Sequence, residues 1–280
     1  MDDVLRSVVL GLLQGLTEFL PISSSAHLAI FPKFFGWSDP GAAYTAVVQI
    51  GTEIAVVLYF WRDIWTIGSG WVRGVFSRAA RQEPEWNMGW FVIIGSVPIV
   101  LIGLALENLI DSEFRNLWVI GTTLIVLGIV LGVAERVGRN AKPIDDLTWG
   151  HAVLFGLAQA AAVVPGVSRS GATISMGLFL GYERAAATRY AFLLAIPAVV
   201  GAGLYKLKDI PGGDNAYGVG PTILGTIVAF AVGIAVIHWL LRYVSTRSYA
   251  PFVAYRIVLG SVVLILLGTG VITADIAING

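Results

Sequence analysis

The amino-acid sequence contains no cysteine among its 280 residues. Disulfide bonds and thiolate metal sites are therefore excluded, and cysteine usage gives no information on the redox compartment. Any covalent catalysis has to use an oxygen or nitrogen nucleophile.

Charged residues are also scarce. They make up 13% of the chain, hydrophobic residues make up 56%, and the mean hydropathy is +0.80, whereas an ordinary soluble domain has about 25% charged residues. Lysine plus arginine equals aspartate plus glutamate at 18 each, so the chain lacks the basic excess that is typical of nucleic-acid binding. The composition predicts a polytopic membrane protein without a nucleic-acid partner.

A cleavable signal peptide is the third feature that the sequence lacks. The first apolar stretch carries Gln14 and Glu18 and runs into Pro21, with no small-residue cleavage pattern. We therefore expect the chain to remain in the bilayer into which it is inserted.

Apolar runs long enough to cross the membrane recur along the chain. A helix needs about 20 residues to cross about 30 Å of hydrocarbon. Six segments meet this length with few charges, and they are residues 43–62, 88–108, 117–136, 186–206, 220–242 and 253–272.

Two further apolar segments are interrupted by polar and turn-forming residues. Residues 4–36 break at "PISSS", and residues 150–181 break at "PGVSRSG". Irregular backbone at membrane depth is tolerated only where protein or a water-filled cavity surrounds it. We therefore predict that both segments form re-entrant helical hairpins, each of which enters and leaves on one side.

Cationic residues at the ends of the spans and in the loops between them gather on one side when the two hairpins do not cross the membrane. Examples are Arg62, Arg73, Arg136, Arg184 and Arg242. The positive-inside rule places that side in the cytoplasm and both termini outside.

The two broken segments are also related to each other in sequence. "GLLQGLTEFLPISSS" at 11–25 aligns without gaps to "GLAQAAAVVPGVSRS" at 156–170. Each half of the chain is then one hairpin followed by three spans, and an odd number of spans makes the second half start from the opposite face. The predicted fold is all-α and polytopic, with an inverted-topology repeat of residues 1–149 and 150–280. The repeats form one membrane domain, and their hairpins meet near the midplane.

The two interruptions are suited to binding an anion. Serine is a good N-cap, and the free N–H groups of a helix start carry about half a positive charge. Arg169 adds a forked donor set that matches phosphate oxygens. We predict a phosphate cradle whose substrate-binding residues, besides Arg169, are Ser23, Ser25, Ser168, Ser170 and Thr173.

The first hairpin supplies groups for chemistry that the second lacks. Gln14 and Glu18 lie four residues apart, on one face of one helix, and His27 follows about one turn into the returning helix. The positions that align with Gln14 and Glu18 are Gln159 and Val163, so the carboxylate has no counterpart in the second half.

Structural alternatives remain for each of these residues. An ionised side chain in hydrocarbon costs about 2.5–3.5 kcal/mol, so Glu18 and Arg169 either pair with each other or serve a site. The serines are packing or capping groups on the structural interpretation, and His27 is a satisfied hydrogen-bond donor. Glu53, in the middle of a span, is either a second metal ligand or part of a helix contact.

The sequence resembles the undecaprenyl-diphosphate phosphatase family, the bacitracin-resistance type of integral membrane phosphatase. "QGLTEFLPISSSAH" at 14–27 is similar to its (E/Q)xxxE motif with the following P-x-S-S-x-x-H, and "PGVSRSGATI" at 165–174 is similar to its PGxSRSxxT motif. The likeness continues through "VVQIGTEIAVVLYFWRD" at 47–63 and covers essentially the whole chain. Gln14 stands where many members have glutamate, which makes it a weaker candidate for metal binding, and we expect it to contact the substrate.

The resemblance implies an enzyme that hydrolyses undecaprenyl diphosphate to undecaprenyl phosphate and inorganic phosphate. That reaction recycles the lipid carrier for cell-wall synthesis and confers bacitracin resistance. It implies a multi-pass protein of the bacterial cytoplasmic membrane, an active site that faces the outer side, and Mg²⁺ or Ca²⁺ as cofactor. The expected partners are the polyprenyl diphosphate, the bilayer and, as a candidate, a second copy of the chain.

By motif position, the resemblance makes Glu18 the essential carboxylate and metal ligand and Arg169 the phosphate-binding arginine. Ser24 and His27 are rival candidates for the nucleophile. We favour Ser24 as nucleophile with His27 as its base or acid.

A second class of function remains open because inverted repeats with broken helices also build secondary transporters. A transporter of an anion or lipid phosphate would need the hairpins and Arg169. It would not need Glu18, Ser24 and His27 together.

Overall fold

A computed structural model of the protein describes residues 2–37, 41–106, 116–206 and 217–275, except the side chains of 42, 43, 202 and 204–206. This described part is helical and contains no β-strand, only two isolated bridges. Its helices are α1 (Asp2–Phe19), α2 (Ser24–Phe35), α3 (Ala42–Tyr59), α4 (Trp61–Phe76), η1 (Ala80–Gln82), α5 (Pro84–Ala105), α7 (Leu117–Val137), η2 (Ile144–Asp146), α8 (Trp149–Ala160), η3 (Ala161–Val163), α9 (Arg169–Phe179), α10 (Arg184–Lys206), α11 (Val219–Val244) and α12 (Ala250–Gly268).

Both interruptions predicted from the sequence are present. The first break, residues 20–23, separates α1 from α2, and the second break, residues 164–168, separates α8 and η3 from α9. Ser23 caps α2 through a hydrogen bond from the Ala26 N–H, and Ser168 caps α9 through one from the Gly171 N–H. The serines therefore end the breaks in the way that their N-cap preference predicts.

Four helices are long and apolar enough to cross a membrane: α5, α7, α11 and α12. They coincide with four of the six predicted spans, apart from residues 107–108 of one span, which lie outside the described residues. The prediction of an all-helical protein with several membrane-crossing helices is confirmed.

The other two predicted spans differ from the structure. The segment 43–62 is not one straight helix, because α3 ends at Tyr59 and the chain bends by 68° into α4. The helix α4 begins with a charged pair, Arg62 and Asp63, which disfavours a continuation through hydrocarbon. The helix α10 covers 186–206 but is not among those that meet the criteria for crossing. Among the described residues the candidates number four, or five with the bent pair.

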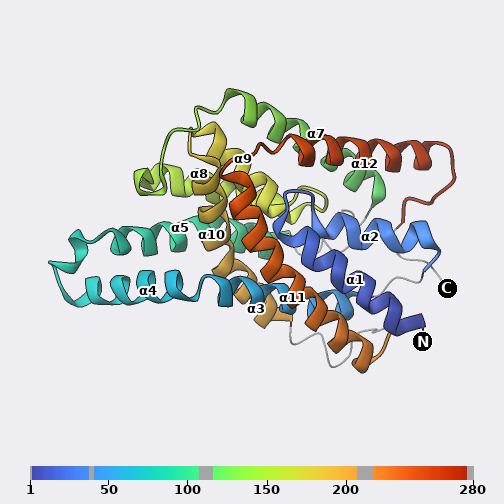
Figure 1. The fold of residues 1–280 in the computed structure, drawn as a ribbon, viewed down its shortest axis with the longest axis horizontal. Coiled ribbons are helices and arrows are strands. Elements are labelled where there is room, and N and C mark those ends of the chain that lie inside the picture. The colour runs from blue at the N-terminus through green and yellow to red at the C-terminus, as the bar shows by residue number, and fades with distance from the viewer. Residues whose placement is uncertain (1, 38–40, 107–115, 207–216, 276–280) are drawn as a thin grey trace.

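Helices from both halves of the chain pack side by side. In Figure 1, α1 lies along α11, α7 lies along α12, and α4 and α5 extend together away from the rest of the protein. The helix α8 contacts α5 as α1 contacts α11. Each hairpin therefore packs against a long apolar helix from the other half of the chain.

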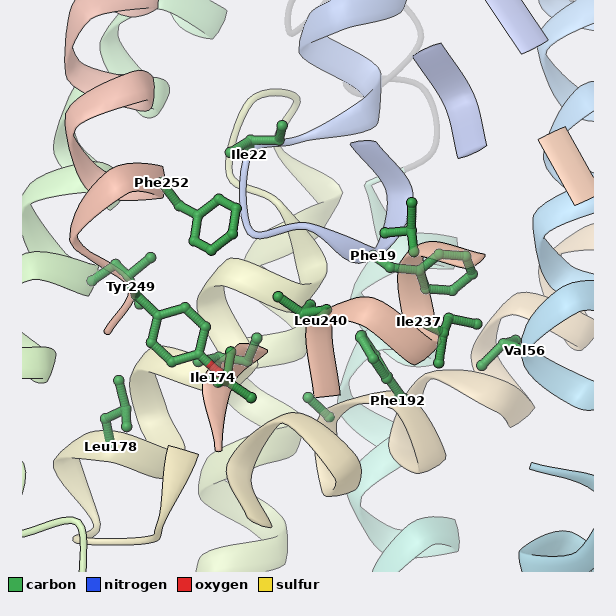
Figure 2. Packing of buried hydrophobic residues seen from close by; sticks show 14 of the residues in the cluster. Phe19, Ile22, Val56, Ile174, Leu178, Phe192, Ile237, Leu240, Tyr249 and Phe252 are labelled. Carbon is green, nitrogen blue, oxygen red and sulfur yellow. The ribbon is translucent and has the colours of Figure 1, made fainter. Parts of the chain in front are cut away.

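One hydrophobic core lies beneath both breaks. Figure 2 shows that side chains from the two hairpins meet others from α3, α10, α11 and α12. The labelled members are Phe19, Ile22, Val56, Ile174, Leu178, Phe192, Ile237, Leu240, Tyr249 and Phe252. Because Phe19 follows Glu18 directly and Ile174 lies one turn after Arg169 and Ser170, this core fixes both ends of the site.

Close backbone contacts join the hairpins to their supporting helices. A Cβ at Gly11 would collide with the Gly225 carbonyl oxygen, and one at Gly156 would collide with the carbonyl oxygen of Gly95. Glycine is therefore required at both crossings, because only it lets the two backbones approach this closely.

The substitution Gly11→Ala tests this packing. Its methyl group meets the α11 backbone, and overpacking of this kind costs about 1–3 kcal/mol, so the melting temperature of the purified protein should fall. The control is Gly103→Ala in α5, where an added Cβ meets nothing within 4 Å. Equal melting temperatures for the two variants would contradict the assignment.

Candidate active site

Glu18 is the centre of a small polar cluster that joins the two hairpins. It lies in the last turn of α1, and its Oε1 is ion-paired with Arg169 at the start of α9. Its Oε2 accepts hydrogen bonds from Gln14 Nε2 at 3.1 Å and from Ser24 Oγ at 2.6 Å. The Glu18 side chain is 9% exposed and that of Arg169 is 20% exposed, so the pair is largely shielded from solvent.

This pairing bears on the two alternatives for Glu18 and Arg169. The two residues do pair with each other, and they also lie together on the wall of one cavity. Its polar wall residues are Glu18, Thr52, Glu53, Arg169 and Ser170, and its apolar wall residues are Phe19, Val56, Ala191, Phe192, Ala195 and Val199. The ion pair therefore borders a space that is lined by both polar and apolar side chains.

The serines form two matching clusters, one at each break. Ser23 Oγ lies 3.1 Å from Ser25 Oγ, and Ser168 Oγ lies 3.2 Å from Ser170 Oγ. Ser23 and Ser168 also share an unusual backbone, with φ of 75° and 69°. Positive φ is costly for a residue other than glycine, so both breaks adopt the same strained turn.

The breaks are also bonded to each other. The Gly166 N–H donates to Ser25 Oγ at 3.4 Å, and Ser170 Oγ donates to the Leu20 carbonyl at 3.1 Å. These serine hydroxyls therefore serve the contact between the hairpins, which is the packing alternative. Ser170 is also among the residues that line the cavity, and its role in binding substrate stays a prediction.

Two residues that the sequence predicts to contact the substrate, Thr173 and Gln14, have side chains hydrogen-bonded within the protein. Thr173 is fully buried, and its hydroxyl donates to the Arg169 carbonyl at 2.8 Å, within its own helix. Gln14 is 2% exposed and is held between Glu18 and Thr52. Neither side chain lines the cavity, but each is hydrogen-bonded to a residue that does, Gln14 to Glu18 and Thr173 to Arg169.

The two ring nitrogens of His27, the expected base or acid for Ser24, both contact groups other than Ser24. Its Nδ1 lies 2.7 Å from the Ser23 carbonyl and its Nε2 lies 2.7 Å from the Tyr255 hydroxyl. A carbonyl only accepts, so Nδ1 carries the proton, and in the neutral ring Nε2 accepts from Tyr255. Ser24 donates its proton to Glu18 and not to His27, so the geometry offers Glu18 as the base for Ser24.

Glu53 is a residue that the sequence left undecided. It is 9% exposed on α3 and lines the same cavity as Glu18. Its carboxylate packs against Gly203 of α10, where a side chain would collide with it. The structure therefore brings a second carboxylate to the cavity.

The carboxylates bear on the predicted cofactor. The described residues contain no group of three or more His, Cys, Asp or Glu that would hold a metal ion. Magnesium is usually bound through one or two carboxylates together with substrate phosphates. The two carboxylates of Glu18 and Glu53 on one cavity wall fit that pattern, whereas a cage made by the protein alone does not.

Sequence reasoning missed two consecutive residues of α12. Tyr255 stacks on His27 with ring planes 5° apart, and the guanidinium of Arg256 is buried against both breaks. A signal for Arg256 was present, because the cost of a charge within an apolar segment, which singled out Glu18, applies equally to an arginine within 253–272.

Comparison with known proteins adds a family to this geometry. The family model described as "Bacitracin resistance protein BacA" matches residues 7–262. The chain is 65% identical to the undecaprenyl-diphosphatase of a Nocardioides species, over 98% of this chain and 100% of that relative. It is 56% identical to the undecaprenyl-diphosphatase of Micrococcus luteus, over 96% and 99% of the two chains. The corresponding protein of Renibacterium salmoninarum is 51% identical, over 98% and 99%.

The hydrogen-bond state of His27 can be tested by ¹⁵N spectroscopy, since the chain has only three histidines. We expect a neutral ring protonated at Nδ1, and Tyr255→Phe should move only the Nε2 signal, because Nε2 loses its donor. The control Tyr59→Phe should move the signal of His238, which Tyr59 contacts. A His27 ring protonated at Nε2 in the unmodified protein would contradict the assignment.

Proposed function

Because the BacA model and its relatives match nearly the whole chain, the chain belongs to the bacitracin resistance protein BacA family, and from this premise we propose how its residues perform that family's reaction. The protein is an undecaprenyl-diphosphatase. It hydrolyses undecaprenyl diphosphate to undecaprenyl phosphate and inorganic phosphate, which recycles the lipid carrier for cell-wall synthesis.

One observation carries the assignment of the reaction to this site. A carboxylate and the arginine that pairs with it line a cavity whose wall carries both polar and apolar side chains, and the hydroxyl of Ser24 donates to that carboxylate. A lipid diphosphate likewise has a polar and an apolar part.

The diphosphate takes the place of Glu18 as the partner of Arg169. A phosphate presents oxygens that match the guanidinium fork, and the starts of α2 and α9 add the partial positive charge of their free N–H groups. These groups stabilise the charge that develops on the phosphoryl oxygens in the transition state. The first isoprene units contact the apolar wall, where Phe19, Val56 and Phe192 provide a matching surface.

Ser24 is the nucleophile in this mechanism. Its Oγ attacks the terminal phosphorus, the bond to the bridging oxygen breaks, and undecaprenyl phosphate leaves. Glu18 accepts the Ser24 proton through the hydrogen bond that already joins them. Water then hydrolyses the phosphoserine and releases inorganic phosphate. His27 orients the start of α2 through its bond to the Ser23 carbonyl.

Mg²⁺ or Ca²⁺ would be held by Glu18, Glu53 and the phosphate oxygens. Glu18 would be available to hold such a cation once the diphosphate took its place as the partner of Arg169. A bound cation neutralises phosphate charge and polarises the phosphoryl group.

The protein is a multi-pass integral membrane protein. We further propose that it lies in the bacterial cytoplasmic membrane with the cavity facing outward, as an inverted repeat of 1–149 and 150–280 with six spans and two re-entrant hairpins. Support comes from the matched strained turns at Ser23 and Ser168 and from the matched glycine crossings. The bent pair α3–α4 and the helix α10 would supply the fifth and sixth spans.

Phosphate release by the purified protein tests the site and separates a phosphatase from a pure transporter. On a long-chain prenyl diphosphate, Glu18→Gln, Ser24→Ala and Arg169→Lys should each lower kcat by on the order of 10²–10⁴-fold. The matched controls Glu83→Gln and Arg73→Lys disrupt only an exposed ion pair and should retain activity. Full activity in the Glu18 and Arg169 variants would remove the proposed site, and no release by the unmodified protein would favour a transporter.

The nature of the covalent intermediate tests the role of Ser24. A phosphoserine trapped from a labelled substrate should survive acid and be cleaved by base, and it should be absent from Ser24→Ala. An adduct that acid cleaves and base preserves would instead identify a phosphohistidine and make His27 the nucleophile.

Removal of the metal tests the two carboxylates. Phosphate release should be lost in a chelator and restored by Mg²⁺. Glu53→Gln should raise the Mg²⁺ concentration for half-maximal activity by about tenfold or more, because one of two protein ligands is lost. Glu83→Gln should leave that concentration unchanged. Activity that is insensitive to the chelator would contradict a metal requirement.

A further inference from the structure

Arg256 is the most deeply buried cation among the described residues. It lies in α12, its side chain is 0% exposed, and none of the ion pairs found in the described part of the chain includes it. An isolated charge in a low-dielectric interior is strongly unfavourable. Its position therefore requires groups that replace the lost water.

Those groups are five backbone carbonyls. Nε donates to Leu124 at 3.2 Å, Nη1 donates to Pro21 at 3.1 Å, and Nη2 donates to Thr123, Gly166 and Val167 at 3.4, 2.9 and 3.0 Å. Pro21 belongs to the first break, Gly166 and Val167 belong to the second, and the remaining two carbonyls belong to α7.

The breaks require such a donor. Where a helix is interrupted, its backbone carbonyls lose their partners within the helix, and unpaired carbonyls at membrane depth are costly. A guanidinium has five N–H donors in a rigid fork, so one side chain can satisfy carbonyls from both breaks at once. A lysine ammonium has three donors on a single nitrogen and cannot span the same set.

We propose that Arg256 is the positioning residue that holds the first break against the second and so sets Glu18 and Ser24 opposite Arg169. It contacts no reacting atom, and it acts through the backbone of both hairpins. Glu18 and Ser24 flank the first break, and Arg169 directly follows the second, so a shift between the breaks separates the groups that the chemistry requires. The inference rests on the proposed function for its kinetic part only.

The charge of Arg256 adds to the phosphate cradle. Nη1 lies 3.1 Å from the position that a Cβ on Gly171 would occupy, in the first turn of α9. A cation with only neutral acceptors keeps its full charge beside that helix start, and it therefore reinforces the potential that favours an anion there.

The test compares the same substitution at a buried arginine, Arg256, and at a partly exposed one, Arg184. Arg256→Lys keeps the charge and loses the fork, whereas Arg184→Lys, its matched control, lies outside the site and keeps Glu135 as its partner. For Arg256→Lys we expect kcat per folded molecule to fall by about 10–100-fold with KM changed less than threefold, because a misplacement of about 1 Å costs that order of rate. Arg184→Lys should remain close to the unmodified protein in both constants.

Backbone hydrogen exchange in lipid nanodiscs gives a readout that does not depend on activity. Peptides covering residues 20–26 and 164–171 should exchange faster in Arg256→Lys, and peptides of α5 should not change. If the wild type releases no phosphate, the proposed function fails while the exchange measurement still decides the positioning role.

Several outcomes would overturn the inference. They are an unchanged kcat, a lower melting temperature with unchanged kcat per folded molecule, or a lower kcat with unchanged exchange at both breaks. If Arg256→Lys does not fold, the same kinetic and exchange measurements on Arg256→Gln and on the unmodified protein decide whether Arg256 has the positioning role. Fast backbone exchange at either break in the unmodified protein would also contradict the proposal that Arg256 holds both breaks.

Discussion

The structure depends on the satisfaction of backbone groups where two helices are interrupted inside an apolar protein. Each interruption leaves carbonyls and N–H groups that hydrocarbon cannot solvate. Side chains meet this requirement: Ser23 and Ser168 cap the following helices, Thr123 donates to the Pro165 carbonyl, and Arg256 donates to carbonyls of both breaks. The same arrangement leaves two helix starts directed at one place, so the solution of a folding problem also creates an anion site.

In the proposed mechanism, the Glu18–Arg169 pair is the state of the site before substrate binds. Two opposite charges that are largely buried stabilise each other, and neither can be removed without leaving the other unpaired. The proposal has a diphosphate replace Glu18 as the partner of Arg169, so that the carboxylate would be available to a cation and to the Ser24 proton. It thereby links substrate binding to activation through one ion pair.

The two breaks share a backbone geometry but differ in the side chains beside them. Each ends in a serine cap at positive φ, and the helix before each break contains a glycine that packs closely on a helix from the other half of the chain. Gln14, however, donates hydrogen bonds to Glu18 and Thr52. The side-chain nitrogen and oxygen of its counterpart Gln159 have no hydrogen-bond partner within the described protein. Gln14 and Gln159 differ in this way because Glu18, the partner of Gln14, has the apolar Val163 as its counterpart in the second half. In the proposed mechanism the first hairpin therefore carries Glu18 and Ser24, and the second supplies Arg169 and a second helix start.

The sequence alone determined that the chain is a multi-pass membrane protein and where both breaks lie, and it singled out Glu18 and Arg169 as residues that pair or serve a site, because length, apolar composition and the cost of intramembrane charge are local properties. It did not determine which hydroxyl, imidazole and carboxylate meet. Ser24 donates to Glu18, His27 turns to Tyr255, and Glu53 reaches the cavity from α3. These contacts depend on how α3 and α12 pack against the first hairpin, and Tyr255 of α12 lies 228 positions beyond His27 in the sequence. Side-chain rotation within one turn of helix is enough to change a partner, and only tertiary packing fixes that rotation.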